Sequence, residues 1–460
     1  MPAFTVQDVV RATQGALVTG DLSVPVTGVS IDSRTLIVGD VFFAIVGHRL
    51  DGHAFLSEAV GRGAACIVVH ALPDEVPANV PLILVEDTTR ALGRLAGWHR
   101  AKFPIPVVAI TGSIGKTTAK ELTAAVLATR YNVLKPASSF NNQWGLPLTL
   151  LRLGPEHQAA VVELGTNQRG EIATLAAIAR PTIGVVTVVA PVHTEFLGSI
   201  DGVREEKAAL VRALAPEAVA VLNADDARVA SMARDCAARV VTYGLAAGAS
   251  VRAIGEVSDD ETGLRFTLES GGRRIPVGLM LAGRHNVTNA LAAAAVGVAL
   301  GLDLDTIARG LGEARAPARR GQWIVAGDVT ILDDTYNASP ASVRAALDTL
   351  GARRRGRRAV VVLGDMLELG VLSDEAHREI GRAVAALPAD EFVGVGRAAA
   401  LAVESARTAG IAEAYHAKSY EDAVAHLTKR LAPGDVVLVK GSRGMRMERV
   451  VDALVARRRG

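Results

Sequence analysis

The sequence predicts an α/β protein of several domains, because short apolar strands alternate with helices and the alternation restarts in the last third of the chain. With 460 residues, the chain exceeds the size of one ordinary core. The apolar run 107–110 and the largely apolar run 219–223 indicate parallel strands that helices cover on both faces. We therefore expect a central parallel-sheet domain at 86–315, a small N-terminal α/β domain at 1–85, and a second nucleotide-fold unit at 316–460.

Each block contains its own apolar runs, which predict strands. The N-terminal runs are 26–31, 41–46 and 64–69, and Asp51-Gly52-His53 opens a helix through Val60. The central runs are 107–110, 159–164, 184–189 and 219–223, followed by antiparallel strands with a Gly-Gly turn within 251–281. The C-terminal runs are 329–333, 359–363, 391–395 and 435–440. Further helices are expected at 116–130 and from about Asn286.

Composition indicates a soluble globular protein, since 50% of the residues are hydrophobic and the net charge is only +2. The arginine clusters contain no interleaved aromatic residues, so we expect no nucleic-acid binding. Cys66 and Cys236 give neither a disulfide framework nor a cysteine metal site. The sequence has neither a signal-peptide pattern nor a membrane-spanning stretch. We expect a cytoplasmic monomer without membrane insertion.

A glycine-rich turn joins the run 107–110 to the helix predicted from Lys116. Glycines let backbone amides approach phosphate oxygens, and a helix N-terminus favours an anion. Lys116 would face the outer phosphates, and the Thr117 hydroxyl suits Mg²⁺. Ile110 replaces the first glycine of the strict phosphate-loop pattern, so a plain tight turn with an exposed lysine is the alternative. The flanking strand and helix favour a nucleotide site made of Thr111, Gly112, Ser113, Ile114, Gly115, Lys116, Thr117 and Thr118.

Two polar residues follow the ends of neighbouring apolar runs. Glu163 lies at the end of one run, and His193 follows the next. Ligands of an open parallel sheet bind outside the carboxyl ends of its strands, so both residues should face the same crevice as the phosphate loop. The alternatives are a helix cap for Glu163 and a loop position for His193. Together with the phosphate loop, the pair favours a Mg²⁺–phosphate site. Lys207, taken alone, would be a solvated helix lysine.

Ordered motifs extend over essentially the whole chain. They are SR at 33–34, GDVFFA at 39–44, DGH at 51–53, TGSIGKTTAKE at 111–121, NNQWGLPLTLL at 141–151, ELGTNQRGEI at 163–172, GRHN at 283–286, NAL at 289–291, DDTYNASPAS at 333–342, LGDMLELG at 363–370 and KGSRGMRME at 440–448. With these motifs the chain resembles the Mur ligases. It departs from the family pattern at Val189-Ala190-Pro191, where Asn-x-Gly is usual, at Thr194, where Leu is common, and at Ser339, where Asn is usual.

The resemblance implies three domains, for a UDP-sugar, for ATP and, in a Rossmann-like C-terminal domain, for the incoming amine. Lys116 and the loop amides would bind the β- and γ-phosphates, and Arg320 would approach the γ-phosphate. Thr117 and Glu163 would hold one Mg²⁺, and His193 with a carbamylated Lys207 a second. A carbamate is an oxygen-donor anion, which suits Mg²⁺ better than a protonated lysine. The residues expected near adenine and ribose are His285, Asn286, Asp334, Tyr336 and Asn337.

The same resemblance suggests substrate contacts. Asn141 and Asn142 both fit the family's asparagine near the phosphates, and we assign Asn142 while the choice stays open. Ser33, Arg34, Asp51 and His53 are expected at the UDP-sugar, and Thr166 and Asn167 at the muramoyl-peptide. Asp365, Ser442 and Arg443 are candidates for holding the dipeptide. A helix cap for Asp365 and a surface position for Arg443 are the alternatives.

The last three motifs are most similar to those of the family member that adds D-alanyl-D-alanine to UDP-N-acetylmuramoyl-tripeptide. The implied reaction is ATP-dependent amide ligation through an acyl phosphate, in peptidoglycan synthesis. The alternatives are a sister ligase that adds the third stem residue, a folylpolyglutamate synthase, or a binding protein that uses its phosphate loop as a switch. The amine that supports ADP release distinguishes the ligases from one another.

Overall fold

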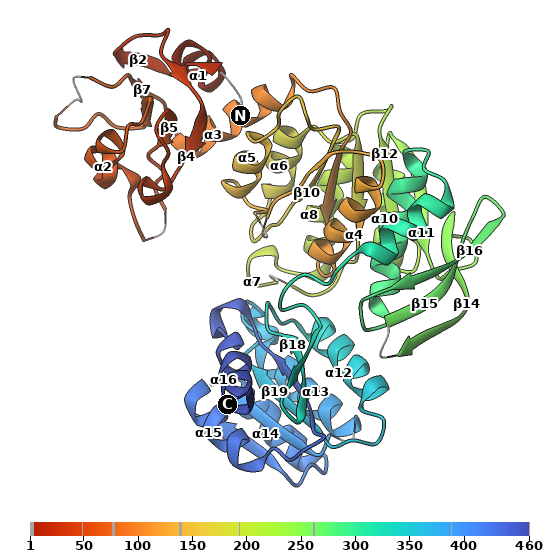
Figure 1. Cartoon of the computed structure of the whole chain (residues 1–460). Helices are drawn as coiled ribbons and strands as arrows, with labels where there is room; N and C mark the ends of the chain where they lie inside the picture. The colour runs from red at the N-terminus through yellow and green to blue at the C-terminus, as the bar shows by residue number, and fades with distance from the viewer. Residues whose placement is uncertain are drawn as a thin grey trace.

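The computed structural model describes residues 4–47, 49–75, 79–137, 140–192, 194–260, 263–387 and 389–459. Figure 1 shows three bodies in chain order, with the N-terminal body at one end and the C-terminal body below the central one. Each body contains a sheet of its own. Among the described residues, no helix combines the length and apolarity that a bilayer crossing requires.

The N-terminal body is built on a five-stranded sheet in the order β2-β7-β6-β5-β4. The strands are β2 (Ala16–Thr19), β4 (Gly28–Ser30), β5 (Asp40–Phe43), β6 (Cys66–Val69) and β7 (Leu82–Leu84). The predicted strand 26–31 is interrupted at Thr27, because β3 (Pro25–Val26) pairs instead with β1 (Phe4–Thr5). The predicted helix begins as a 3₁₀ turn, Gly52–Phe55, and continues as α2 (Leu56–Gly61).

Helix α3 (Thr88–Arg100) connects the first two bodies. It starts after Asp87, whose side chain accepts from the backbone N–H of Arg90 at 2.9 Å. Its buried face joins the cores of both bodies, since one apolar cluster includes residues of α1 (Val6–Thr13), α3, α5 (Gly145–Leu150) and α6 (Glu171–Ala179). The boundary that we predicted after residue 85 precedes this shared helix.

The central sheet has nine strands in the order β16-β15-β14-β13-β12-β11-β8-β10-β9. The strands β9 (Val133–Leu134), β10 (Ala159–Glu163), β8 (Val107–Thr111), β11 (Ile183–Val186), β12 (Val219–Asn223), β13 (Arg239–Gly244) and β14 (Val251–Asp260) are parallel to their neighbours in that series. Antiparallel β15 (Gly263–Ser270) and β16 (Arg273–Leu279) complete it, with Gly271 and Gly272 in the predicted turn.

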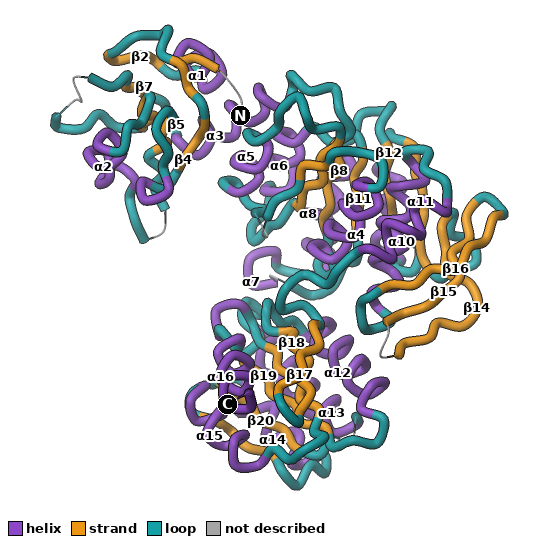
Figure 2. The backbone as a smooth tube through the Cα atoms, viewed as in Figure 1, coloured by secondary structure: helices purple, strands orange, loops and turns teal. Residues whose placement is uncertain are grey.

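Helices cover both faces of the parallel part, as the apolar runs predicted. Val108 and Ile110 of β8 belong to the core formed with α4 (Lys116–Ala128), α10 (His285–Ala299) and α11 (Leu304–Glu313). Val107 and Ala109 alternate with them and face the core of α3, α5 and α6. The long helix α8 (Ile200–Arg212) lies beside two short helices, α7 (Thr194–Leu197) and α9 (Ala227–Ser231). Figure 2 shows these helices in purple and the strands of the sheet in orange.

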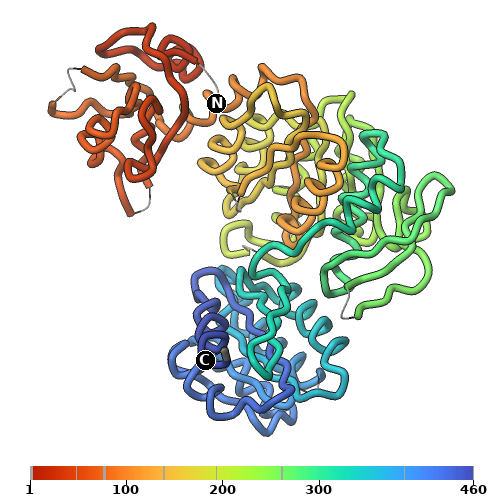
Figure 3. The backbone as a smooth tube through the Cα atoms, in the orientation of Figure 1, coloured from red at the N-terminus to blue at the C-terminus, as the bar shows by residue number. Residues whose placement is uncertain are grey.

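The C-terminal body has a six-stranded sheet in the order β17-β18-β22-β19-β20-β21. The strands are β17 (Gln322–Ala326), β18 (Val329–Asp334), β22 (Val436–Lys440), β19 (Ala359–Gly364), β20 (Glu391–Val395) and β21 (Ala414–Ala417), and only the β17–β18 pair is antiparallel. Helices α12 (Pro340–Arg354), α13 (Ser373–Ala386) and α14 (Ala399–Thr408) cover one face, and α15 (Tyr420–Arg430) and α16 (Glu448–Arg459) the other. Figure 3 follows the chain into this body after α11.

Candidate functional site

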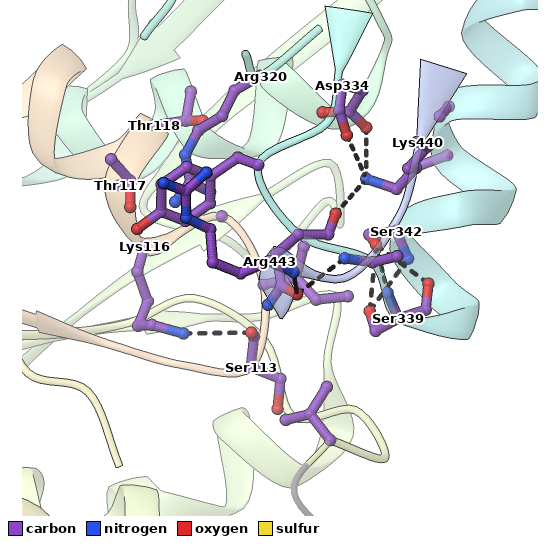
Figure 4. Close-up of a pocket in the computed structure, with 18 of the residues that line it drawn as sticks. Ser113, Lys116, Thr117, Thr118, Arg320, Asp334, Ser339, Ser342, Lys440 and Arg443 are labelled. Atoms are coloured by element: carbon purple, nitrogen blue, oxygen red, sulfur yellow. Dashed lines mark hydrogen bonds and ion pairs between the residues drawn. The ribbon is translucent and has the colours of Figure 1, made fainter. Parts of the chain in front are cut away.

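A cavity of about 460 Å³ lies between the central and C-terminal bodies. The central body contributes the phosphate loop, the end of β10 and the start of α10, and the C-terminal body contributes the ends of β18 and β22. The carboxyl ends of parallel strands are where open α/β sheets bind ligands. Figure 4 shows Lys116, Thr117 and Thr118 facing Arg320, Asp334 and Lys440 across this space.

The phosphate loop has a backbone that requires glycine at two positions. Gly112 and Gly115 have φ angles of 141° and 84°. A Cβ on Gly112 would lie 2.0 Å from Oγ1 of Thr187, and one on Gly115 would lie 2.4 Å from Oδ1 of Asn289. Lys116 begins α4 directly after Gly115, so the loop residues from Ser113 on and the first helical turn line the cavity, where a helix N-terminus favours an anion.

Lys116 is held along the loop. Its Nζ donates to the backbone oxygens of Gly112 at 2.8 Å and Ser113 at 3.2 Å. Burial lowers the pKa of Lys116, and the nearby Arg320 lowers it further, while Glu163 acts in the opposite direction. The positive charges of Lys116 and Arg320 therefore repel each other across the cavity. A bound anion between them would reduce this repulsion.

Glu163, at the end of β10, is buried and does not cap a helix. Its Oε2 accepts from Oγ1 of Thr117 at 2.8 Å, and its Oε1 accepts from Nδ2 of Asn141 at 2.8 Å. Asn142, which we assigned to the nucleotide, instead accepts at Oδ1 from the amides of Trp144 and Gly145 at the start of α5. Only Asn141 of the two asparagines lines the cavity.

The donors around Glu163 fit a hard cation. A carboxylate and a hydroxyl are oxygen ligands, which Mg²⁺ prefers, especially beside phosphates. Among the described residues, no three His, Cys, Asp or Glu side chains gather as a metal cage. His193, our candidate for a second cation, lies outside the described residues.

Lys207 is not the solvated lysine that its sequence context alone indicated. It lies on α8 and is only 1% exposed. Burial lowers its pKa well below the ordinary value, and the charge of Lys116 acts in the same direction, against Glu206, Glu163 and Glu171. The neutral amine of Lys207 is therefore easier to form than that of an exposed lysine.

Arg320, Lys440 and Arg443 of the C-terminal body line the cavity. The guanidinium of Arg320 lies 3.8 Å from the ring centre of Tyr336, a cation–π contact that fixes its position. Lys440, which we did not predict, lies 2.5 Å from Oδ2 of Asp334 and donates to the backbone oxygen of Asn337 at 2.8 Å. The sequence signals for it were its place at the end of the run 435–440 and at the start of the motif KGSRGMRME.

Comparison with known families decides the relationship. Residues 110–297 match the Mur ligase middle domain, residues 319–443 match the glutamate ligase domain of Mur ligases, and residues 25–100 match the Mur ligase family catalytic domain. The chain is 38% identical to UDP-N-acetylmuramoyl-tripeptide–D-alanyl-D-alanine ligase of Escherichia coli, over 96% of this chain and 95% of that protein.

The chain belongs to the Mur ligase family.

Two other similar proteins support the assignment of this chain to the Mur ligase family. The Mycobacterium tuberculosis protein of the same name is 39% identical, over 94% of this chain and 92% of its own length. A crystal structure of MurF from Acinetobacter baumannii superposes with a TM-score of 0.92 at 32% identity and covers 99% of both chains. The fold class that we predicted, three α/β domains of which the central one carries the phosphate loop, is confirmed.

Further residues of this Mur ligase form the cavity's other walls. Asn286, at the start of α10, donates from Nδ2 to the backbone oxygen of Ala282 at 2.7 Å and accepts from Nδ2 of Asn289 at 2.9 Å. Thr166 donates from Oγ1 to the backbone oxygen of Gln168 at 2.6 Å, which fixes the turn before α6. Asn167 lines the cavity beside it.

The three dipeptide candidates separate in the structure of this Mur ligase. Ser442 accepts from the backbone N–H of Leu367 at 2.8 Å, and Arg443 pairs with Glu448 at 3.1 Å, and both line the cavity. Asp365 does not line it. Its Oδ1 accepts from the backbone N–H of Ala399 at 2.7 Å, at the start of α14, as the helix-cap alternative predicts.

The UDP-sugar candidates lie in the N-terminal body, away from this cavity (Figure 1). Oγ of Ser33 donates to Glu58 at 2.8 Å. Arg34 pairs with Asp32 at 2.7 Å, and Nδ1 of His53 lies 2.7 Å from Oδ1 of Asp51. The structure thus brings together the predicted nucleotide residues except Thr111, Gly112 and Asn142, which do not line the cavity, and leaves these four in a separate body.

Proposed function

We propose that this Mur ligase joins D-alanyl-D-alanine to UDP-N-acetylmuramoyl-tripeptide at the expense of ATP. The observation that carries the proposal is the cavity between the two larger bodies, where Lys116 and Glu163 face Arg320 and Asp334. A related MurF from Thermotoga maritima, 28% identical with a TM-score of 0.83 over 93% of this chain and 97% of that one, was crystallised in complex with ADP. A triphosphate in this cavity would meet cations from both bodies.

In the first step, the terminal carboxylate of the tripeptide attacks the γ-phosphorus of ATP, and ADP leaves. Lys116 and the loop amides bind the outer phosphates, and Arg320 approaches the transferring group from the C-terminal body. Charge neutralisation at the transferring phosphoryl group is the main contribution that a protein makes to such a step. Magnesium, when bound at Thr117 and Glu163, supplies additional positive charge there.

In the second step, the amine of D-alanyl-D-alanine attacks the carbonyl carbon of the acyl phosphate. The amide bond forms, inorganic phosphate leaves, and the amine loses a proton. The C-terminal body holds the dipeptide near Ser442 and Arg443, while Thr166 and Asn167 receive the muramoyl-peptide. Holding both reactants in line can contribute on the order of 7 to 11 kcal/mol.

The N-terminal body binds the UDP-sugar in this proposal, through Ser33, Arg34, Asp51 and His53. The reacting carboxylate lies at the far end of the same substrate, so the sugar contacts anchor a molecule that extends toward the cavity. Binding energy from such remote groups can offset the cost of desolvating and orienting the reacting carboxylate. We keep these four residues as candidates for that role.

Lys207 is proposed to carry a carbamate. The reaction requires a neutral amine, which attacks CO₂ and then loses a proton, and the lowered pKa of Lys207 favours this form. The product would be an oxygen-donor anion close to Lys116, whose charge lowers the pKa of Lys207. A carbamate and His193 would together suit a second magnesium.

The alternative ligases have weaker support. The diaminopimelate-adding ligase and the Mycobacterium tuberculosis folylpolyglutamate synthase among the solved structures are 17% and 20% identical, with TM-scores of 0.55 and 0.63, which indicates a shared fold. In the deciding experiment, each precursor and its amine are added in turn to purified protein with ATP and Mg²⁺. ADP release should depend on D-alanyl-D-alanine with the tripeptide precursor. Release with diaminopimelate or lysine and the dipeptide precursor, or with glutamate and a folate, would reject the proposal. ATP binding without any amine-dependent release would favour the switch protein.

A further inference from the structure

A buried ion pair joins the central and C-terminal bodies. Asp259 of β14 accepts at Oδ1 from Nε of Arg353, in α12, at 2.7 Å, and Nη2 of Arg353 lies 2.5 Å from the same oxygen. Their side chains are only 5% and 11% exposed. The ring centre of Trp323 lies 5.7 Å from the guanidinium. Figure 1 shows β14 approaching α12 at this boundary, and neither charged residue has a part in the proposed reaction.

The second oxygen of Asp259 holds a turn of the central body. Oδ2 accepts from the backbone N–H of Gly283 at 2.9 Å. Gly283 has a φ of 88°, and a Cβ there would lie 2.5 Å from Oγ1 of Thr349 in α12 and 2.6 Å from Cε1 of His285. The Gly283 turn and α12 therefore approach each other closely, and Asp259 binds both.

Both partners of Asp259 adjoin residues that line the cavity. The Gly283 turn leads directly into His285 and Asn286, which line it. On α12, Ser342, Ala346 and Thr349 also line it, and Arg353 continues the same face one turn further. The ion pair thus fixes the end of one cavity wall against the other.

We propose that Asp259 and Arg353 are positioning residues of the nucleotide site, which hold α12 against the Gly283 turn and so form the wall that receives the base and ribose of ATP. The inference rests on the proposed function in taking ATP as the occupant. Removing one partner leaves the other charge buried and unpaired, so the two walls separate. A smaller fraction of molecules then has the binding-competent arrangement, and the apparent affinity for nucleotide falls in proportion to that fraction.

Steady-state kinetics test the pair through Arg353→Met and Asp259→Asn, with Arg353→Lys as the conservative variant. We expect the KM for ATP to rise about tenfold in the first two, which corresponds to about 1.4 kcal/mol, with a smaller rise for lysine. The kcat at saturating ATP should stay within about twofold, because a positioning role is overcome by more ligand. The matched control is Arg344→Met, on the same helix, whose pair with Glu379 is exposed.

A binding measurement separates this inference from the ligase assignment. In a Trp98→Phe/Trp144→Phe background, Trp323 fluorescence reports the titration with Mg·ADP, and its midpoint should rise about tenfold in Arg353→Met. Melting temperatures identify variants that do not fold. If Arg353→Met does not fold, the same titration of Arg353→Lys tests the inference. Unchanged midpoints and KM values beside a lowered melting temperature would overturn the inference. A wild type that binds ADP yet forms no product would instead contradict the proposed function alone.

Discussion

The hydroxyl of Thr117 donates to Oε2 of Glu163 at 2.8 Å, so the residue after the phosphate-loop lysine already meets the end of the neighbouring strand. The contact needs no ligand, because β8 and β10 are parallel neighbours whose carboxyl ends share one edge. The phosphate loop starts at one strand end and Glu163 is the last residue of the other. In the proposed reaction, these two oxygen donors would be preorganised for a cation at the phosphates.

Glu163→Gln should lower kcat about a hundredfold to a thousandfold, because it removes the charge from this pair of donors. The Mg²⁺ concentration for half-maximal rate should rise with it. Rates measured across a Mg²⁺ titration give both values. Glu121→Gln, a carboxylate of α4 that pairs with Lys120 outside the cavity, should leave both unchanged. Equal effects of the two variants would remove Glu163 from the metal site.

Arg320 and Arg319 provide a matched pair of neighbouring arginines. Arg320 lies on Tyr336 and lines the cavity, whereas Arg319 pairs with Glu448 at 3.0 Å. Arg320→Ala should lower kcat about a hundredfold, because charge neutralisation at the γ-phosphate is lost. Arg319→Ala should change kcat little. Single-turnover formation of ADP measures the affected step, and a larger defect in Arg319→Ala would contradict the assignment.

Lys207 should give a carbamate signal in ¹³C NMR when the protein is equilibrated with ¹³C-bicarbonate. The low pKa of its buried amine favours the neutral form that reacts with CO₂. The signal should disappear in Lys207→Met and persist in Lys120→Met, which removes another lysine that is 1% exposed. A signal that survives in Lys207→Met would belong to a different amine.

His99 predicts a dependence of stability on pH. Its Nε2 lies 2.9 Å from the backbone oxygen of Leu153, and burial lowers its pKa below the usual 6.5. The unfolded chain therefore takes up a proton below pH 6.5 that the folded protein does not, so stability falls as the pH decreases. The slope is at most about 1.4 kcal/mol per pH unit for one proton. Urea unfolding between about pH 7.5 and 5.5 should show a smaller slope for His99→Gln than for wild type.

Strands with a mostly apolar sequence were predicted well, because burial on both faces leaves a nearly continuous apolar signal. The runs 219–223 and 391–395 match β12 and β20 at both ends. The run 184–189 was predicted too long. After Val186 the chain leaves the sheet and binds the phosphate loop, where the amide of Ser113 donates to the backbone oxygen of Val188 at 2.7 Å. Such a contact depends on tertiary structure and leaves no periodic signal.

Site residues could be predicted where a sequence motif identifies them. They could not be predicted where only the folded structure determines which of two adjacent residues faces the site. Asn141 and Asn142 are chemically identical, and only the path of the chain after residue 140 directs the first toward Glu163. Lys440 was missed because its partner Asp334 lies 106 residues earlier in the sequence. The ends of β18 and β22 adjoin only in the folded sheet.

Mass spectrometry of the product tests the central claim most directly. Wild-type protein would be incubated with ATP, Mg²⁺, UDP-N-acetylmuramoyl-tripeptide and D-alanyl-D-alanine. The account predicts a UDP-muramoyl-pentapeptide whose mass is the sum of the two substrates less one water, with one ADP and one phosphate for each product. Hydrolysis of ATP without that pentapeptide, or a product that forms equally without ATP, would contradict it.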